Sequence, residues 1–357
     1  MRSFASDNNA GVDPRILAAL GAANQGHAIG YGADEWTRRM EQAFREAFGP
    51  ETRAYAVLTG TGANVLSLAA LLEPHHAVLC AHNSHLWVDE GGAPERFLGA
   101  KLIPVRAKAG KLQVADLAAE LQDPKDEHRA QPKLISVTQA TEVGTLYSLA
   151  ELAEIAAFAR EHDFYLHMDG ARLANAAVAL NCSLAELVRG VDVLSFGATK
   201  NGLLCGEAVV FLRPGLDRRF KFLRKQGMQL ISKMRFVSAQ LEAYLSQQIW
   251  ADNARHANAM AQYLAKAIVD IPGVELAFEV ESNAVFVRLP TALIAPLQAH
   301  RYFYVWDERA AIARWMTAFD TQTDDIDDFV EVLRQLASQQ TLPGPAPHSP
   351  PLHEVCP

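Results

Sequence analysis

The chain has 357 residues, of which 50% are hydrophobic and 21% are charged. These values are ordinary for globular proteins and exclude a disordered, collagen-like or coiled-coil chain. With 33 Lys and Arg against 41 Asp and Glu, the net charge is −8, which argues against a nucleic-acid or anionic-membrane partner. We therefore expect a protein that handles small molecules, built as one large and one small domain.

Cysteine spacing and hydropathy restrict the kinds of site and the cellular location that we expect. The four cysteines are too far apart for a CxxC pair, so reduced thiols and no metal site are expected; they are Cys80, Cys182, Cys205 and Cys356. Residues 1–14 lack the apolar core of a signal peptide, and no run approaches the roughly 18 apolar residues of a membrane span. By elimination, we expect a cytoplasmic protein.

The first part of the chain reads as helices and then as alternating strands and helices. Pro14 suits the first position of a helix that continues to residue 23, and a second helix is expected over 35–48. Buried-type strands are expected at 55–58, 77–80, 133–137, 164–168, 191–196 and 207–212. Helices are expected at 65–72, 114–121, 148–161 and 172–180. This alternation predicts an α/β fold with a mostly parallel sheet covered on both faces.

The pattern changes after residue 217. A long helical region to about residue 270, broken near Gly227, precedes the strand-like segments 274–280, 284–289, 302–306 and 312–318 and a helix over 323–338. We therefore expect a large domain over 1–240 and a smaller α+β domain over 241–340. The Pro-rich residues 341–357 are expected to form a disordered tail.

Two side chains carry the strongest chemical signal. Asp169 ends one apolar strand, and Lys200 follows the next one, VDVLSFG. Ligands bind at this carboxyl edge of open α/β sheets. An Asp and a Lys placed there suit pyridoxal 5'-phosphate (PLP), because the amine forms a Schiff base and the carboxylate holds the pyridine nitrogen protonated. Alone, Asp169 could cap a helix and Lys200 could be a solvated loop residue, but together they favour the cofactor.

A phosphate site is predicted in TGTGAN (59–64), read as a turn ahead of a helix. Backbone N–H groups at a helix N-terminus and nearby hydroxyls suit a phosphate dianion. The segment is neither a Walker loop nor GxGxxG.

Several motifs together resemble a known family. SDN near the start, YGAD (31–34), TGTGAN, HLWVDEGGAPE, DGAR and SFGATKNG resemble low-specificity L-threonine aldolases and phenylserine aldolases, from about residue 4 to residue 338. The resemblance implies the PLP-dependent aspartate-aminotransferase fold type, with a seven-stranded sheet in the large domain. It also implies cleavage of β-hydroxy-α-amino acids to glycine and an aldehyde.

The resemblance assigns roles to individual residues. Lys200 would be the Schiff-base lysine and Asp169 the pyridinium partner, while His85, with His82 as an alternative, would stack on the ring. The phosphate would be held by Gly60, Thr61, Thr199 and, from a neighbouring subunit, Arg235. Arg172, which would also border the cofactor, and Arg314 would bind the substrate carboxylate with help from Ser6, and His128 would approach the substrate hydroxyl.

Some of these assignments have structural alternatives. Arg314 could be an edge-strand charge facing water, and His128 could lie in an exposed loop. Family members often carry a Gly-rich segment where this chain has ISKMRFV, so Arg235 keeps the Arg without the glycines. Tyr31 is also expected from a neighbour, which implies a homotetramer built from two active dimers. Tyr31 and Trp87 would line the substrate side chain and favour L-phenylserine over L-threonine.

The same cofactor residues also suit a β-eliminating lyase or an aminotransferase. A non-catalytic binding protein on this fold is the more distant alternative.

Overall fold

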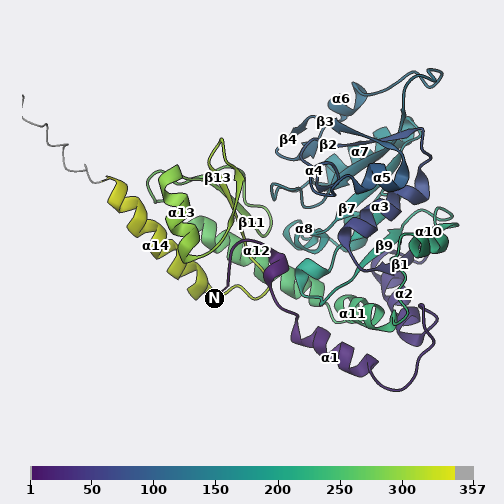
Figure 1. Ribbon diagram of the computed structural model, residues 1–357, viewed down its shortest axis with the longest axis horizontal. Helices are drawn as coiled ribbons and strands as arrows, with labels where there is room; N and C mark the ends of the chain where they lie inside the picture. The colour runs from purple at the N-terminus through teal and green to yellow at the C-terminus, as the bar shows by residue number, and fades with distance from the viewer. Residues whose placement is uncertain (1, 342–357) are drawn as a thin grey trace, which may run out of the picture.

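Residues 2–341 are described by a computed structural model, and they form two units, each built on its own sheet (Figure 1). The larger sheet has seven strands, ordered β1 (Arg53–Val57), β9 (Glu207–Phe211), β8 (Val193–Phe196), β7 (Tyr165–Gly170), β6 (Gln131–Thr138), β2 (His76–Ala81) and β3 (Lys101–Val105). All strands run the same way except β9, which is antiparallel to both neighbours. The expected mostly parallel α/β sheet is confirmed.

Both faces of this sheet are buried. Along β2, Leu79 and Ala81 point into one apolar core, while Val78 and Cys80 point into the other. This alternation follows from the two-residue period of a strand, and burial on both faces explains why the strands read as continuous apolar runs. The helices of this unit are α1 (Pro14–Ala23), α2 (Glu35–Phe48), α3 (Gly60–Leu71), α4 (His85–Val88), α5 (Ala93–Leu98), α6 (Val114–Ala118), α7 (Leu149–Glu161), α8 (Leu173–Ala179), α9 (Leu184–Leu187), α10 (Phe220–Gln226) and α11 (Arg235–Ser246).

The first two helices begin and end where the sequence predicts. Asp13 caps α1 by accepting a hydrogen bond from the Arg15 N–H, and Pro14 takes the first helical position. Asp34 caps α2 through the Thr37 N–H. Side-chain caps satisfy backbone donors that have no partner inside the helix.

Helix α3 begins five residues earlier than the sequence pattern predicts, so GTGAN forms its first turn instead of a separate loop. The hydroxyl oxygen of Thr59 accepts a hydrogen bond from the Gly62 N–H at 3.0 Å and caps the helix. Gly60 and Gly62 weaken a helix interior, but the cap and the packing of α3 against β7, β8 and β9 outweigh that cost. The glycines therefore lie at a helix N-terminus.

The second unit is an antiparallel sheet flanked by helices. Its strands are ordered β10 (Glu275–Leu276), β11 (Ala284–Arg288), β13 (Ile312–Met316) and β12 (Tyr304–Asp307). Its helices are α12 (Ile249–Ala267), α13 (Thr291–His300) and α14 (Thr323–Thr341). Helix α13 was not expected from the sequence, because its apolar and small residues show no clear period. Strand β3 and the hairpin of β4 (Ala107–Lys108) and β5 (Lys111–Leu112) were not expected either.

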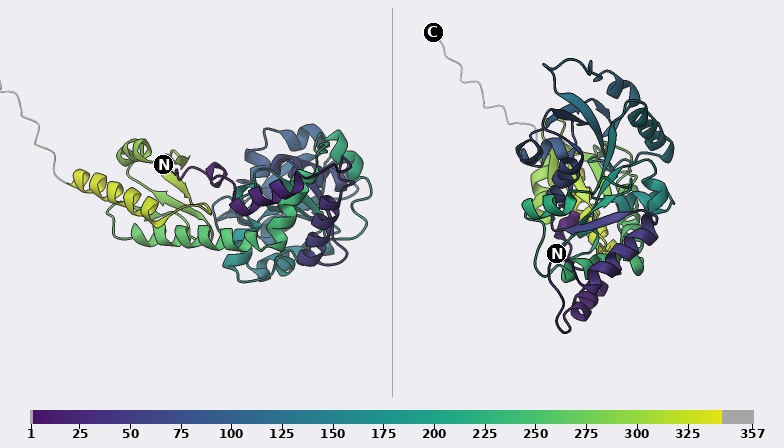
Figure 2. Two further views of the ribbon diagram at one scale, coloured as in Figure 1. Left: turned by 90° about the horizontal axis from the view of Figure 1, so that it is seen from below. Right: turned by 90° about the vertical axis from the view of Figure 1, so that its right-hand side faces the viewer.

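The N-terminal segment joins the two units. Phe4 donates its N–H to the Tyr302 carbonyl at 3.0 Å and accepts the Met316 N–H at 2.8 Å. Its ring packs edge-on against Phe329 at 4.9 Å, inside the core of the second unit. The chain then crosses toward the large unit (Figures 1 and 2), while α12 extends alongside both. Residues 6–8 consequently lie between the two sheets.

The domain limits expected at residues 240 and 340 stay predictions. Apart from Thr341, which ends α14, the expected tail over 341–357 lies outside the described residues. Across residues 2–341, no helix combines the length and the apolar character that crossing a membrane requires.

Candidate active site

Asp169 and Lys200 lie together at the carboxyl edge of the large sheet. Asp169 is near the end of β7, directly opposite Ser195 of the parallel strand β8, and Lys200 lies in the short 3-10 turn that follows β8. Both line a cavity of about 310 Å³. Burial, and then the positive charge of Arg172, lower the pKa of the Lys200 amine. A lowered pKa favours the neutral, nucleophilic amine.

The Asp169 carboxylate is held by two N–H donors. The Ala171 N–H donates to Oδ1 at 2.9 Å, and the Asn64 side-chain amide donates to Oδ2 at 2.9 Å. The same Asn64 amide also donates to Glu90 Oε1 at 3.0 Å. These contacts fix the carboxylate's orientation from α3 and from the loop after β7.

His85 is oriented by Glu90, which the sequence analysis did not single out. Its Nδ1 lies 3.0 Å from Glu90 Oε1, and this hydrogen bond raises the pKa of the imidazole. Burial alone would raise the pKa of Glu90, but hydrogen bonds from His85, Thr61 and Asn64 outweigh it and lower that pKa. The alternative residue, His82, instead accepts the Ala107 N–H at 3.2 Å. Only His85 of the two lines the cavity.

Three residues expected to hold the phosphate line the same cavity as Lys200. Gly60 and Thr61 form the first turn of α3, and Thr199 precedes Lys200; all three line the cavity. The Thr199 hydroxyl also accepts the Gly206 N–H at 3.2 Å. Helix N–H groups that have no intrahelical partner point out of this end of α3, which suits an anion.

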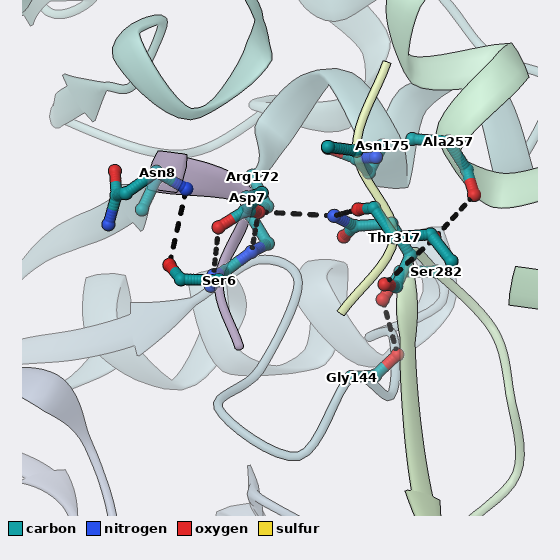
Figure 3. A network of polar contacts seen from close by, with 12 residues as sticks. Ser6, Asp7, Asn8, Gly144, Arg172, Asn175, Ala257, Ser282 and Thr317 are labelled. Carbon is teal, nitrogen blue, oxygen red and sulfur yellow. Dashed lines mark hydrogen bonds and ion pairs between the residues drawn. The ribbon is translucent and has the colours of Figure 1, made fainter. Parts of the chain in front are cut away.

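Arg172 is held by a carboxylate from the N-terminal segment. Its Nε and Nη2 donate to the two oxygens of Asp7 at 2.7 and 2.9 Å, and the Asn283 side chain donates to Asp7 at 3.1 Å (Figure 3). Burial alone would raise the pKa of Asp7, but Arg172 outweighs it and lowers that pKa. Asp7 thus fixes the Nε–Nη2 edge of the guanidinium. Arg172 also lines a second cavity of about 440 Å³.

Arg314 reaches the same cavity from β13. Its Nη2 donates to the Ala5 carbonyl at 3.2 Å, and its guanidinium lies 5.7 Å from the Tyr304 ring and 5.6 Å from the Trp306 ring. Its Nε is buried without a partner in the described part of the chain. Burial, and then the charge of Arg172, lower the pKa of this guanidinium. Two guanidiniums that border one cavity can bind a carboxylate between them.

The two cavities adjoin, because Asn8, Gly60, Asn64, His85 and Lys200 line both. Ser6 lines the second cavity, and its hydroxyl oxygen accepts the Asn8 N–H at 3.2 Å. The interpretation of Arg314 as an edge charge facing water is wrong: β13 lies between β11 and β12, and the guanidinium is turned into the cavity.

His128 is not brought into this site. It is exposed in the loop before β6 and lines a separate surface hollow with Lys101 and Glu120. Strand β6 rises about 23 Å between its first and last residues, and the site lies at its far end, where Thr138 borders the cavity. Its expected place near the substrate hydroxyl is therefore corrected: within this chain His128 lies at the opposite edge of the sheet.

Three further expected residues do not line the two cavities. The Trp87 side chain points outward from α4 and is 43% exposed. Tyr31 is 57% exposed, with the Lys225 ammonium 5.2 Å from its ring. Arg235 begins α11 and donates to the Gly26 carbonyl at 3.1 Å. Tyr31 and Arg235 were expected from a neighbouring subunit, so this placement leaves that expectation untested.

Two carboxylates of the site, one buried and one partly buried, were not predicted from the sequence. Glu207 lines the Lys200 cavity and accepts the Ala198 N–H at 2.7 Å, and Glu142 lines the second cavity. Burial raises the pKa of each to about 7. A signal related to the one that found Asp169, a carboxylate near the carboxyl end of an apolar strand, also marks Glu142, which lies four residues past the end of β6.

The residues present could hold PLP. A buried amine, a carboxylate oriented by two donors, a partly exposed imidazole and an open helix N-terminus border one continuous space. Gly197 lets the end of β8 approach this wall closely, because a Cβ there would lie 2.5 Å from Ala171 Cα. The set matches an aldehyde-bearing aromatic ring with a phosphate group.

A family model described as beta-eliminating lyase matches residues 3–291. A low-specificity L-threonine aldolase of Pseudomonas aeruginosa is 42% identical, covering 93% of this chain and 97% of that protein. A second, from a Pseudomonas species, is 40% identical over 94% of this chain and 98% of the relative. Among solved structures, a threonine aldolase of Leishmania major superposes with a TM-score of 0.90 at 31% identity, covering 94% of this chain and 100% of that one.

Proposed function

Because the chain belongs to the beta-eliminating lyase family, we propose that it is a PLP-dependent aldolase that cleaves β-hydroxy-α-amino acids to glycine and an aldehyde. L-threonine, L-allo-threonine and L-phenylserine are the proposed substrates. The observation that carries the proposal is the convergence of Lys200, Asp169, Arg172 and Arg314 on one continuous space. Its relatives' names support the same reaction.

Each of these residues has a distinct task. The Lys200 amine would hold the cofactor covalently, and Asp169 would hold a proton on its ring nitrogen. The phosphate would rest on Gly60, Thr61 and Thr199 at the start of α3. When bound, PLP supplies the electron sink that allows the Cα–Cβ bond of an amino acid to break.

The substrate carboxylate would be bound between the two guanidiniums. Arg314 offers its unpaired Nε, and Arg172, fixed through Asp7, offers its remaining side. Charge-assisted bonds of this kind are about twice as strong as neutral ones and fix orientation as well as affinity. They would align the Cα–Cβ bond with respect to Lys200.

We also infer a homotetramer in which Tyr31 and Arg235 complete a neighbour's site. Exposed apolar side chains gather near these residues in the sequence and support burial in an assembly: Ile29 is 73% exposed and Met228 is 72% exposed. Sedimentation of the loaded enzyme is expected to give a tetramer, and a fully active monomer would contradict this assembly. The cytoplasmic location stays a prediction of the sequence.

Product analysis tests the proposed reaction. Purified protein loaded with PLP is incubated with L-threonine, L-allo-threonine and L-phenylserine, and aldehyde, glycine, ammonia and keto acid are measured. Equal amounts of glycine and aldehyde are expected. Ammonia with a keto acid would instead establish β-elimination, and no product from any substrate would favour a non-catalytic protein.

A further inference from the structure

Glu142 is a carboxylate of the site that has no role in binding the cofactor or the substrate carboxylate in the proposed function. It follows β6 and lines the cavity that also contains Lys200, Arg172 and Arg314. Its Oε1 accepts the His85 N–H at 2.8 Å and the Thr138 hydroxyl at 2.8 Å. The side chain is therefore fixed to both the start of α4 and the end of β6.

The other oxygen of Glu142 has no protein partner. Oε2 is buried and accepts no hydrogen bond from the described residues, although the residue as a whole is partly exposed to the cavity. A buried acceptor without a donor is costly in a folded protein. Such an atom beside a substrate cavity indicates that its donor is supplied by the ligand.

The surroundings give this carboxylate a pKa suited to proton transfer. Burial raises the pKa to about 7, the negative charge of Asp169 adds to the rise, and the bonds from His85 and Thr138 oppose it. Other ionisable groups that line this space are Asp89, Glu90, Arg172, Lys200, Tyr304 and Arg314, and Cys80 and Tyr147 also interact electrostatically with the Glu142 carboxylate. A pKa near the working pH is what a general base requires.

We propose that Glu142 accepts the proton of the substrate's β-hydroxyl group during carbon–carbon cleavage, a role that rests on the proposed function. The O–H electron pair becomes the C=O π bond of the aldehyde, and the Cα–Cβ pair stays with Cα. Cα then gains a proton and Glu142 loses one, so glycine and aldehyde form without any other reactant.

The other carboxylates near the substrate space differ from Glu142 in their exposure or in their hydrogen bonding. Glu90 Oε2 is also buried without a partner among the described residues, but the Glu90 side chain is 0% exposed and its pKa is lowered. Asp169 is held by Ala171 and Asn64, and Asp89 is exposed at the rim of the cavity. Glu207 lines only the Lys200 cavity, where it accepts the Ala198 N–H. Among the described residues of the second cavity, Glu142 is thus the carboxylate that combines a fixed position, a buried oxygen without a partner and partial exposure to the substrate space.

Glu142→Gln tests the role, because the amide keeps the shape and an acceptor oxygen for the His85 N–H but cannot take a proton. Aldehyde release from L-threonine is expected to fall about 100-fold or more. Exchange of the α-proton of glycine in deuterated water, followed by NMR, is expected to change less than threefold, because glycine has no hydroxyl group. The Kd for glycine, read from the cofactor's absorbance, should also stay constant.

The matched control is Glu281→Gln, which changes a carboxylate that accepts the Leu146 N–H at 2.8 Å outside both cavities. It should leave aldehyde release and glycine exchange unchanged. Glu142→Asp, which retains an ionisable group, should recover part of the cleavage that Glu142→Gln loses. Melting temperatures of the cofactor-free variants show whether each protein is folded.

The pH profile supplies an independent readout. Wild-type kcat/KM for L-threonine should rise with pH until about 7, because Glu142 is a base only when ionised, and Glu142→Gln should lack this limb while Glu281→Gln keeps it. Normal cleavage by Glu142→Gln, or equal losses of cleavage and glycine exchange, would overturn the proposal. A wild type that neither cleaves threonine nor exchanges glycine would instead refute the proposed function itself.

Discussion

The site has a cofactor end, formed by Asp169 and Lys200, and a carboxylate end, formed by Arg172 and Arg314. Asp169 lies on β7 and Lys200 follows the neighbouring strand β8. Arg172, by contrast, lies just after β7 in the large unit and Arg314 lies on β13 of the second unit, and the N-terminal segment contacts both. At the cofactor end, the parallel strands β7 and β8 set the spacing of the two groups. At the carboxylate end, Asp7 and Ala5 bind the two arginines from a segment whose Phe4 is anchored in the second unit.

The difference lies in what each end requires from the chain. The cofactor end depends on adjacent strands and a helix N-terminus, which are local consequences of sequence. The carboxylate end depends on how the two units meet, because Arg314 moves with β13 and Arg172 with β7. Changes at the cofactor end should thus affect chemistry, while changes at the carboxylate end should affect substrate affinity and orientation.

The largest effect is expected from Lys200→Ala, which removes the amine at the centre of the cofactor end. Turnover should become undetectable, because the remaining lysines have no place in either cavity. In the wild type, borohydride reduction followed by peptide mass mapping should find the cofactor on Lys200. A label on any other lysine would refute the assignment.

At the cofactor end, Asp169→Ala should be the next most damaging change. Loss of one charge-assisted hydrogen bond, about 1.5–3 kcal/mol, corresponds to a fall in kcat of about 10- to 150-fold. KM for the amino acid should change little, since the arginines are untouched. The measurement is steady-state kinetics on the PLP-saturated variant with a melting curve as control; near-normal kcat would count decisively against this role.

Much of the cofactor end could be predicted from sequence because its cues are local. Each cue spans only about ten residues of the sequence: an apolar strand that leads to Asp169, a second apolar strand that leads to Lys200, and a glycine-rich segment before a helix. The start of α3 was misplaced, since glycine propensity argued for a turn while the Thr59 cap and packing against the sheet extended the helix.

The rest of the site depends on contacts that no local pattern displays. Asp7 and Glu90 acquire their roles from Arg172 and His85, which the fold brings to them. His128 was misplaced because proximity to β6 in the sequence does not reveal which end of the strand a residue borders. Glu142, beyond the carboxyl end of the same strand, is the residue that enters the cavity.

The carboxylate end is tested by Arg314→Ala, compared with Asp7→Asn. Arg314→Ala should raise KM for L-threonine about 10- to 100-fold with a smaller effect on kcat, because it removes a charge-assisted contact to the substrate. Asp7→Asn leaves Arg172 in place but weakens its orientation, so its effect on KM should be smaller. If Arg314→Ala lowers only the melting temperature, Arg314 is structural.

The smallest expected effect concerns the preference between substrates that differ in their side chain, because aromatic residues beside the carboxylate end can contact that side chain. Trp87 does not line the cavity, whereas Tyr304 and Trp306 of β12 do. Trp306 is held edge-on against Phe286 at 5.4 Å and so presents a fixed surface. Stacking against such a ring is worth about 0.5–1.5 kcal/mol beyond burial, or roughly 2- to 13-fold in kcat/KM.

We therefore expect a higher kcat/KM for L-phenylserine than for L-threonine, since a phenyl group also buries more apolar area than a methyl group and benzaldehyde gains conjugation as it forms. Trp306→Ala should lower that ratio several-fold. Trp87→Ala is the matched control and should leave the ratio unchanged, because its side chain is outside the cavity. The measurement is kcat/KM for both substrates with the wild type, Trp306→Ala and Trp87→Ala. A wild-type preference for L-threonine contradicts the expectation. A ratio that changes in Trp87→Ala and not in Trp306→Ala would indicate that Trp87, at a subunit interface, contacts the substrate's side chain instead of Trp306.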